Sequence, residues 1–161
     1  MIIVLMGVAG AGKTAIGTRL AHELNWVFYD GDDFHPQSNV DKMAQGIALT
    51  DEDRAAWLQS LRRLIHDLSS AGTPAVIACS ALKESYRQML QAGGAEVQFV
   101  YLRGTYQLIK ERLEQRRGHF MPVDLLASQF ETLEEPEGAL TIDVSQRPAA
   151  IVRAIRRGLK V

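Results

Sequence analysis

The chain has 161 residues, of which 47% are hydrophobic and 23% charged, a composition that is ordinary for one globular domain. Its formal net charge of −1 gives no global electrostatic reason to expect a nucleic acid or a membrane surface as partner, so any phosphate binding must be local. The single cysteine, Cys79, cannot form an internal disulfide, and the apolar run at residues 2–6 is too short to span a membrane, so we expect a cytoplasmic protein.

The N-terminal part of the chain predicts a strand, a glycine-rich turn, a helix and a second strand. Residues 2–6 are a continuous apolar run, typical of a parallel strand buried on both faces, and the run ends at Gly7. After the turn, apolar residues recur at the spacing of a helix: Ile16, Leu20, Ala21 and Leu24. Residues 26–29 predict a second short strand, which ends in the acidic stretch 30–33.

The rest of the chain continues to alternate strands and helices. Thr50 is placed to cap a helix with an acidic first turn, and Gly72 and Pro74 end that helix. The elements that follow are predicted as a strand at 75–79, a helix at about 83–91, a strand at 97–102, a helix at 106–115, a strand at 140–144 and a helix from Pro148 to near Gly158. Such alternation predicts one α/β domain over residues 1–161, with helices on both faces of a parallel sheet.

The turn after the first strand carries a phosphate-binding motif. Backbone N–H groups and glycines let such a loop surround a β-phosphate, the lysine adds charge on the β- and γ-phosphate oxygens, and the hydroxyl at its end is placed to bind Mg²⁺. We therefore predict that the loop binds ATP and that Lys13 is catalytic; a glycine-rich turn with an incidental lysine and a nucleotide-hydrolysing motor remain alternatives. The residues that match the motif are Gly7, Val8, Ala9, Gly10, Ala11, Gly12, Lys13 and Thr14.

Acidic residues follow the second predicted strand, at the edge of the sheet where ligands bind in open α/β folds. A kinase for an alcohol needs a carboxylate that accepts the proton of the hydroxyl, and a second acid can hold magnesium, often through water. We assign these roles to Asp32 and Asp30, with Asp33 as an alternative base and a solvated acidic turn as the alternative for the whole segment. His35 either hydrogen-bonds the acceptor or caps the short helix that follows.

Six segments together resemble the gluconate kinase family over nearly the whole length. The resemblance implies transfer of the γ-phosphate of ATP to the 6-hydroxyl of D-gluconate. It also implies a three-layer P-loop kinase fold with a five-stranded parallel sheet in the order 2-3-1-4-5, a mobile lid and, in many members, a homodimer. The segments are residues 7–14, Asp30-Gly31-Asp32-Asp33-Phe34-His35-Pro36, residues 49–58, Cys79-Ser80-Ala81-Leu82-Lys83 with the four residues after it, Gly118-His119-Phe120-Met121, and residues 129–136.

Gluconate carries one carboxylate and five hydroxyls, so its site should offer a cation at one end and mixed hydrogen-bonding groups along the chain. The substrate-binding candidates beside Asp32 and His35 are Arg54, Lys83 and Arg87. Lys83 follows a predicted strand end, which favours ligand contact. Arg54 lies early in a helix, where an exposed salt bridge to Asp51 or Asp53 is the alternative, and the resemblance favours the substrate.

A basic segment follows the helix at 106–115. Arg112 and Arg116 lie four residues apart on one helical face, and residues 116–136 approximate the predicted lid. The resemblance implies that both arginines bind ATP and that Arg116 stabilises charge in the transition state, whereas a solvated helix face paired to Glu111 or Glu114 is the alternative. His119 and Gln129 are predicted to reach the substrate when the lid closes.

Two other readings remain open. A kinase for another small acceptor, similar to shikimate kinases, would share the phosphate loop and the acidic strand end, but shikimate kinases carry a glycine-rich triplet where this chain has Ser80-Ala81-Leu82. A non-catalytic nucleotide-binding module is the second, although the acid pair and the basic lid argue against it. A GTP-binding switch would carry an Asn-Lys-x-Asp motif, which the sequence lacks.

Overall fold

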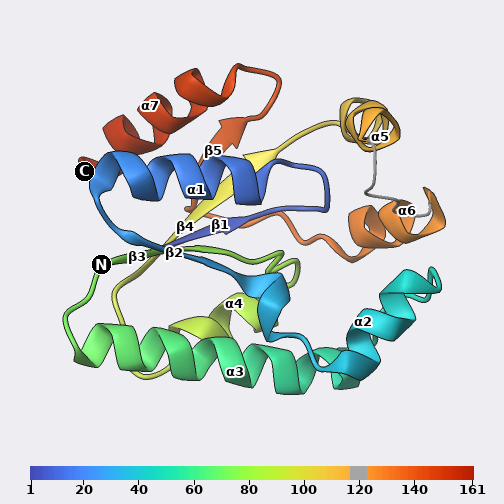
Figure 1. Cartoon of the computed structure of the whole chain (residues 1–161), viewed down its shortest axis with the longest axis horizontal. Helices are drawn as coiled ribbons and strands as arrows, with labels where there is room; N and C mark the ends of the chain where they lie inside the picture. The colour runs from blue at the N-terminus through green and yellow to red at the C-terminus, as the bar shows by residue number, and fades with distance from the viewer. Residues whose placement is uncertain (117–122) are drawn as a thin grey trace.

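The computed structural model describes residues 1–116 and 123–161. In this part of the chain, five parallel strands lie in the order β2-β3-β1-β4-β5 with helices on both sides (Figure 1). The predicted fold class and strand order are therefore confirmed. The strands are β1 Ile2–Met6, β2 Val27–Asp30, β3 Ala75–Ala78, β4 Val97–Arg103 and β5 Leu140–Asp143. The helices are α1 Lys13–Leu24, the 3-10 helix η1 Gly31–Phe34, α2 Gln37–Ala44, α3 Asp51–Ser70, α4 Glu84–Gln91, α5 Tyr106–Gln115, α6 Val123–Thr132 and α7 Pro148–Leu159.

Strand β1 lies at the centre of the sheet and divides the core in two. It pairs in parallel with β3 on one side and β4 on the other, and all five of its side chains are buried. Successive residues of a strand point to opposite faces. Ile3 and Leu5 accordingly pack with α1, α5 and α7, whereas Ile2, Val4 and Met6 pack with α3 and α4. The continuous apolar run is thus explained by burial on both faces of the sheet.

The start of helix α3 and its buried face match the signals in the sequence. The Thr50 hydroxyl accepts a hydrogen bond from the Asp53 N–H, and the Asp53 carboxylate accepts one from the Thr50 N–H, which is a complete capping box. The buried side chains of this helix, including Trp57, Leu58 and Leu61, form its stripe against the sheet. Capping and burial together fix the start of α3, and with it the position of Arg54 one turn later.

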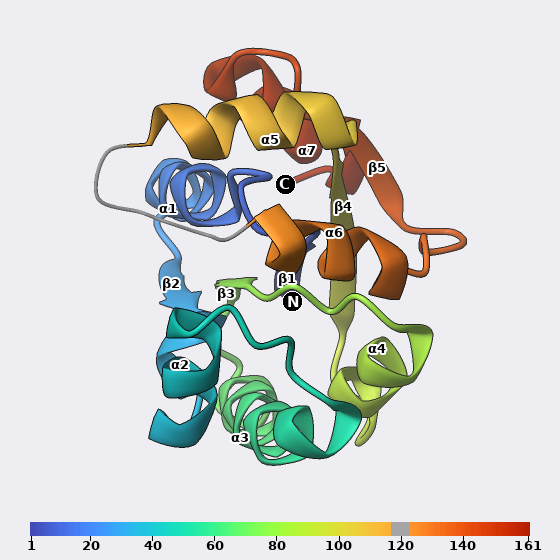
Figure 2. The same ribbon diagram turned by 90° about the vertical axis from the view of Figure 1, so that its right-hand side faces the viewer.

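All five strands run in the same direction, so the segments that follow β1, β2 and β3 emerge at one edge of the sheet. Figure 2 views the molecule from this edge, where α2 and α6 lie. Helix α6 lies within the predicted lid, where no helix or strand was predicted. The lid residues 117–122 lie outside the described residues.

Cys79 is a buried free thiol, and burial raises its pKa to about 12. In the described ranges, no helix is long and apolar enough to cross a membrane.

Candidate active site

The phosphate loop, residues 7–14, connects the central strand β1 to helix α1. Gly10 adopts a φ of +80°, and a Cβ there would lie 2.9 Å from Cγ of Leu113 on α5. A larger residue would therefore be strained in backbone conformation and would also collide with α5. This close packing holds the loop against α5, the helix that Arg116 follows.

Lys13 lies at the start of α1 and points back into the loop. Its Nζ donates hydrogen bonds to the carbonyl oxygens of Gly7 at 3.0 Å and Val8 at 2.9 Å. Burial lowers the pKa of Lys13 below its ordinary value, and the carboxylates of Asp32 and Asp30 act in the opposite direction. The ammonium group is thus held inside the site and surrounded by acids that stabilise its charge.

Thr14 and Asp30 bring a hydroxyl and a carboxylate together beside this lysine. Thr14 Oγ1 donates to Asp30 Oδ2 at 2.8 Å, and Asp30 Oδ1 accepts a hydrogen bond from the Asp32 N–H at 3.0 Å. Both groups are hard oxygen donors, which suit Mg²⁺; such an ion completes its octahedral shell with waters and substrate phosphates rather than with a protein cage. The pair fits magnesium, and the described residues contain no cluster of three or more His, Cys, Asp or Glu side chains for another metal site.

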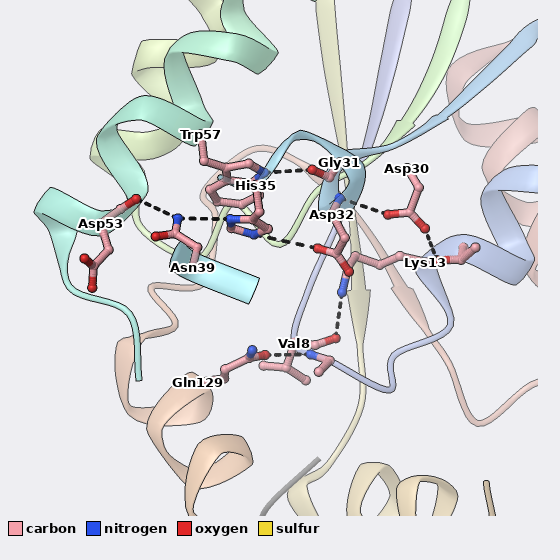
Figure 3. Close-up of polar contacts among 12 residues, drawn as sticks. Val8, Lys13, Asp30, Gly31, Asp32, His35, Asn39, Asp53, Trp57 and Gln129 are labelled. Carbon is pink, nitrogen blue, oxygen red and sulfur yellow. Dashed lines mark hydrogen bonds and ion pairs between the residues drawn. The ribbon is translucent and has the colours of Figure 1, made fainter. Parts of the chain in front are cut away.

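Gly31 determines how Asp30 and Asp32 leave strand β2. A Cβ at Gly31 would lie 2.4 Å from the carbonyl oxygen of Ala78 on β3, so only glycine allows this close approach of the two chains. The indole Nε1 of Trp57 donates to the Gly31 carbonyl oxygen at 2.8 Å. The turn that carries both acids is therefore fixed from two sides, by β3 and by α3 (Figure 3).

Opposing effects act on the pKa of the Asp32 carboxylate. The surrounding protein raises its pKa above the ordinary aspartate value by desolvation, and Lys13 opposes this shift. The side chain is nevertheless 77% exposed, because it projects into an open cleft. Asp32 is thus accessible to a ligand and held close to a cation.

An open cleft of about 980 Å³ runs along the phosphate loop and α1. It brings together most of the predicted nucleotide ligands, the two acids and Arg116, which is exposed at the end of α5. The volume of the cleft lies at the upper end of the range of about 300 to 1,000 Å³ that is typical of ligand sites, so the cleft has room for a nucleotide. Its lining residues are Ala9, Gly10, Gly12, Lys13, Thr14, Ala15, Thr18, Arg19, His22, Asp30, Asp32, Leu113 and Arg116.

A second, smaller pocket adjoins the cleft and shares Ala9, Lys13 and Asp32 with it. Its remaining wall comes from segments far apart in the sequence, on the α2–α3 side and on α6. The pocket combines two cations, Lys13 and Arg54, with the Asp32 carboxylate and several neutral polar groups, which suits a polyhydroxy acid. The other lining residues are His35, Met43, Ala48, Leu49, Arg54, Trp57, Ser80, Leu82, Leu125, Ser128 and Gln129.

The imidazole of His35 forms part of this wall. The ring stacks on Trp57 with centroids 4.3 Å apart and an interplanar angle of 13°, and its side chain is only 5% exposed. Burial first, and then the charge of Arg54, lower the pKa of His35 to about 4. His35 is therefore neutral at physiological pH. Its predicted place in the acceptor site is consistent with this geometry.

Arg54 faces the pocket and is held by Tyr86. One guanidinium nitrogen donates to the Tyr86 hydroxyl at 3.1 Å, and the guanidinium carbon lies 5.7 Å from the ring centroid. The Tyr86 hydroxyl in turn donates to Asp51. The alternative predicted for Arg54, a salt bridge to Asp51 or Asp53, is not what the structure shows, because the ionic partners of those acids are Lys83 and Lys42.

Gln129 links helix α6 to the phosphate loop. Its Oε1 accepts a hydrogen bond from the Ala9 N–H at 2.7 Å. Ala9 and Gln129 both line the smaller pocket, and Ala9 also lines the cleft. Gln129 therefore stands beside the boundary between the two, and Figure 3 shows its hydrogen bond to the phosphate loop.

Two predicted ligands, Lys83 and Arg112, take other positions, and a third cannot be placed. Lys83 Nζ donates to both carboxylate oxygens of Asp51, at 2.9 and 3.1 Å, and is not a lining residue of either pocket. Arg112 donates to the Val144 carbonyl oxygen at 2.5 Å and thereby joins α5 to the end of β5. His119 lies outside the described residues.

Arg87 differs most from its predicted substrate-binding role. It is 3% exposed, and its guanidinium donates to the carbonyl oxygens of Ala81, Leu82 and Glu134. Its remaining partner is the Glu84 carboxylate at 2.8 Å. These contacts consume the donors of the guanidinium and hold the loop after β3 against the segment after α6. The structure thus corrects the prediction: Arg87 supports the pocket wall and does not face the pocket.

Sequence reasoning did not identify Asn39, Tyr86 or Trp57 as parts of the site. Asn39 and Tyr86 hold His35 and Arg54, whereas Trp57 is 1% exposed and also supports both His35 and Gly31. The one available signal was the spacing of four residues between His35 and Asn39, which fits a contact at the start of a helix, since His35 lies just before α2. Nothing in the local sequence links Tyr86 to Arg54.

Comparison with known proteins agrees with this geometry. A model described as shikimate kinase matches residues 9–137. The thermosensitive gluconokinase of Escherichia coli strain K12 is 44% identical over 160 residues, which cover 97% of this chain and 86% of the relative. The chain belongs to the gluconokinase family.

Solved structures similar to the chain include two kinases at 40% identity or more. A gluconokinase from Sinorhizobium meliloti 1021 is 44% identical, with a TM-score of 0.88, and the match covers 98% of this chain and 90% of that one. An unliganded sugar kinase from Janibacter sp. HTCC2649 is 40% identical, with a TM-score of 0.94 and coverage of 99% and 94%. The family and the kinase fold are therefore established on both sequence and structure.

Proposed function

We propose that this protein transfers the γ-phosphate of ATP to the 6-hydroxyl of D-gluconate and thereby forms 6-phospho-D-gluconate. The observation that carries the proposal is the junction of the two pockets. Lys13 and Asp32 line both, so a nucleotide in the cleft and an acceptor in the smaller pocket would meet at these two side chains. The names of the relatives, which are gluconokinases at about the same identity in several organisms, support gluconate as the acceptor.

The chemistry needs a proton acceptor and charge neutralisation at the junction. A bond forms between the acceptor hydroxyl oxygen and the γ-phosphorus, the bond from that phosphorus to the β–γ bridging oxygen breaks, and the hydroxyl proton passes to Asp32. Lys13 and Arg116 carry positive charge toward the transferring group. Mg²⁺, when bound near Thr14 and Asp30, would neutralise charge on the β- and γ-phosphate oxygens.

The smaller pocket suits a polyhydroxy acid. Arg54 offers a positive charge for the carboxylate, and charge-assisted bonds of this kind are the stronger ones. His35 and Gln129 offer neutral hydrogen-bonding groups for hydroxyls. Asp32 stands where the terminal hydroxyl would enter the junction. We infer that Arg54 and Asp32 mark the two ends of the bound gluconate.

The test is an ADP-release assay with MgATP and, separately, gluconate, shikimate, other sugar acids and no acceptor. Gluconate alone should drive turnover, and Asp32→Asn should reduce it by about a thousandfold while ATP still binds. Asp33→Asn is the matched control, because Asp33 is the neighbouring acid and lines neither pocket. Turnover with shikimate would favour the alternative acceptor, and equal ADP release without acceptor would contradict the proposal.

A further inference from the structure

Asn39 is a buried polar residue on helix α2 that the proposed reaction does not use directly. Its side chain is 2% exposed and lies between His35 and helix α3. The amide Nδ2 is 2.7 Å from the backbone carbonyl oxygen of Asp53 and 3.2 Å from His35 Nδ1 (Figure 3). One nitrogen atom therefore makes both contacts.

The first contact fixes the orientation of the amide. A carbonyl oxygen can only accept, so the atom that faces Asp53 must be the NH₂ group of Asn39. An NH₂ group has two hydrogens and no acceptor capacity, so its second hydrogen points at His35 Nδ1. Nδ1 must then accept that hydrogen bond and carry no proton of its own.

The second contact thus determines the tautomer of His35. A neutral imidazole with an unprotonated Nδ1 carries its hydrogen on Nε2. Nε2 faces the catalytic side, with Asp32 Oδ1 at 4.0 Å. Among the described residues, the charged side chains that line the same pocket as the ring are Asp32 on η1, Arg54 on α3 and Lys13 on α1. Gln129 of α6 lines the same pocket without charge.

We infer that Asn39 is a positioning residue that holds His35 as the Nε2–H tautomer, so that His35 donates a hydrogen bond toward the junction and leaves proton acceptance to Asp32. The inference rests on the proposed function for its catalytic consequence, but the tautomer itself does not depend on it. A histidine in the opposite tautomer would present a lone pair to the Asp32 carboxylate, which would repel it and compete for the hydroxyl proton.

Trp57 makes the arrangement rigid. It stacks on the face of the His35 ring while its Nε1 holds the Gly31 carbonyl oxygen, so the ring and the turn that carries Asp32 share one support. The donor and the acid are thereby kept in a fixed relation. Asn39 adds what stacking cannot supply, which is the choice of the nitrogen that carries the proton.

The first test is ¹⁵N–¹H NMR of histidine-labelled full-length protein at pH 7, with the His35 signals assigned by their loss in His35→Gln. We expect a protonated-type Nε2 and an unprotonated, acceptor-type Nδ1. A protonated Nδ1, or two nitrogens averaged between the states, would overturn the inference. This measurement needs no substrate, so it stands even if gluconate is not the acceptor.

The second test uses Asn39→Leu, which removes the donor with little change in volume, and Gln37→Leu as control. Gln37 is an exposed amide on the same helix that contacts Asp41 instead. Asn39→Leu should shift His35 toward the Nδ1–H form and lower kcat about three- to tenfold at nearly constant ATP KM, and Gln37→Leu should change neither.

A double variant separates positioning from simple structural loss. Glutamine has no tautomers, so in a His35→Gln background the Asn39→Leu substitution should leave kcat within about twofold, although its cost in thermal stability remains. An unchanged kcat in Asn39→Leu alone, with the tautomer altered, would overturn the catalytic role. A kcat loss that persists in full in the His35→Gln background would overturn it as well.

Discussion

The phosphate loop and the smaller pocket, which we propose binds the acceptor and call the acceptor pocket, are built in opposite ways. The loop is one continuous segment whose lysine bonds to carbonyl oxygens five and six residues away. The acceptor pocket joins side chains that are 75 residues apart, such as Arg54 and Gln129, and each is held by a partner from another element. The loop therefore carries its geometry in a motif, whereas the pocket acquires its geometry only when the domain folds.

This difference predicts how the two regions respond to substitution. In the loop, function should fail where a single side chain is lost, and folding should hardly suffer. In the pocket, supporting residues such as Arg87 should affect stability, and Arg54, which faces the pocket, should affect acceptor binding. Four substitutions sharpen the comparison, in order of expected effect.

The largest effect is expected for Lys13→Met. Loss of the charge on the transferring phosphate should lower kcat by about three orders of magnitude, equivalent to about 4 kcal/mol. Thermal stability should stay equal or rise, since burial lowers the pKa of Lys13 and the ammonium is costly to bury. Steady-state kinetics and calorimetry measure both. A variant that loses stability together with activity would contradict the expectation that Lys13 serves function and contributes little to folding.

Arg87→Leu should destabilise the fold by about 3 kcal/mol, because it leaves three buried carbonyl oxygens without their donor. Denaturant unfolding measures this loss. At a temperature where the variant is folded, the gluconate KM should remain within about threefold of the wild-type value. A large rise in gluconate KM without loss of stability would restore Arg87 as a ligand.

His35 should make stability depend on pH. Its pKa is about 4 in the folded state and about 6.5 in the unfolded chain, so the unfolded chain binds more protons between these values. Stability should therefore fall as the pH decreases from 6.5 to 4, by up to about 3 kcal/mol. Unfolding free energies measured across this window should show a shallower fall in His35→Gln. Parallel curves for the two proteins would contradict the assignment.

Arg54→Met should raise the gluconate KM about ten- to a hundredfold, the worth of one charge-assisted hydrogen bond, and leave the ATP KM within about twofold. Arg62→Met is the matched control, since Arg62 is exposed on the same helix and lines neither the cleft nor the smaller pocket. Equal effects on both substrates would place Arg54 at the junction rather than at the far end of the acceptor.

The sequence was most informative where chemistry and local structure coincide. The phosphate loop, the acidic turn and the capping box at Thr50 each follow from residues close in the chain. Helix α6 was not predicted, because residues 116–136 were assigned to a lid without further elements, although Leu126 and Phe130 stand four residues apart, as they would on one face of a helix. The apolar spacing in this segment was therefore a usable signal for α6, even within a predicted lid.

The roles of the cations were harder to predict, because burial and partners decide them. Arg54 and Arg87 have the same chemistry, yet the first faces a pocket and the second is enclosed by carbonyl oxygens from residues 81, 82 and 134. Lys83 follows a strand end as predicted, but it pairs with Asp51. The resemblance placed these residues near the site, and only the tertiary contacts separate ligands from supports.

The central claim is that nucleotide and acceptor meet at Lys13 and Asp32, and ³¹P NMR of a single incubation tests it most directly. With MgATP and gluconate, the account predicts one phosphomonoester on gluconate for each ADP formed and no inorganic phosphate. ADP accompanied by an equal amount of inorganic phosphate, with gluconate unaltered, would show that water and not the acceptor occupies the junction, and would contradict it.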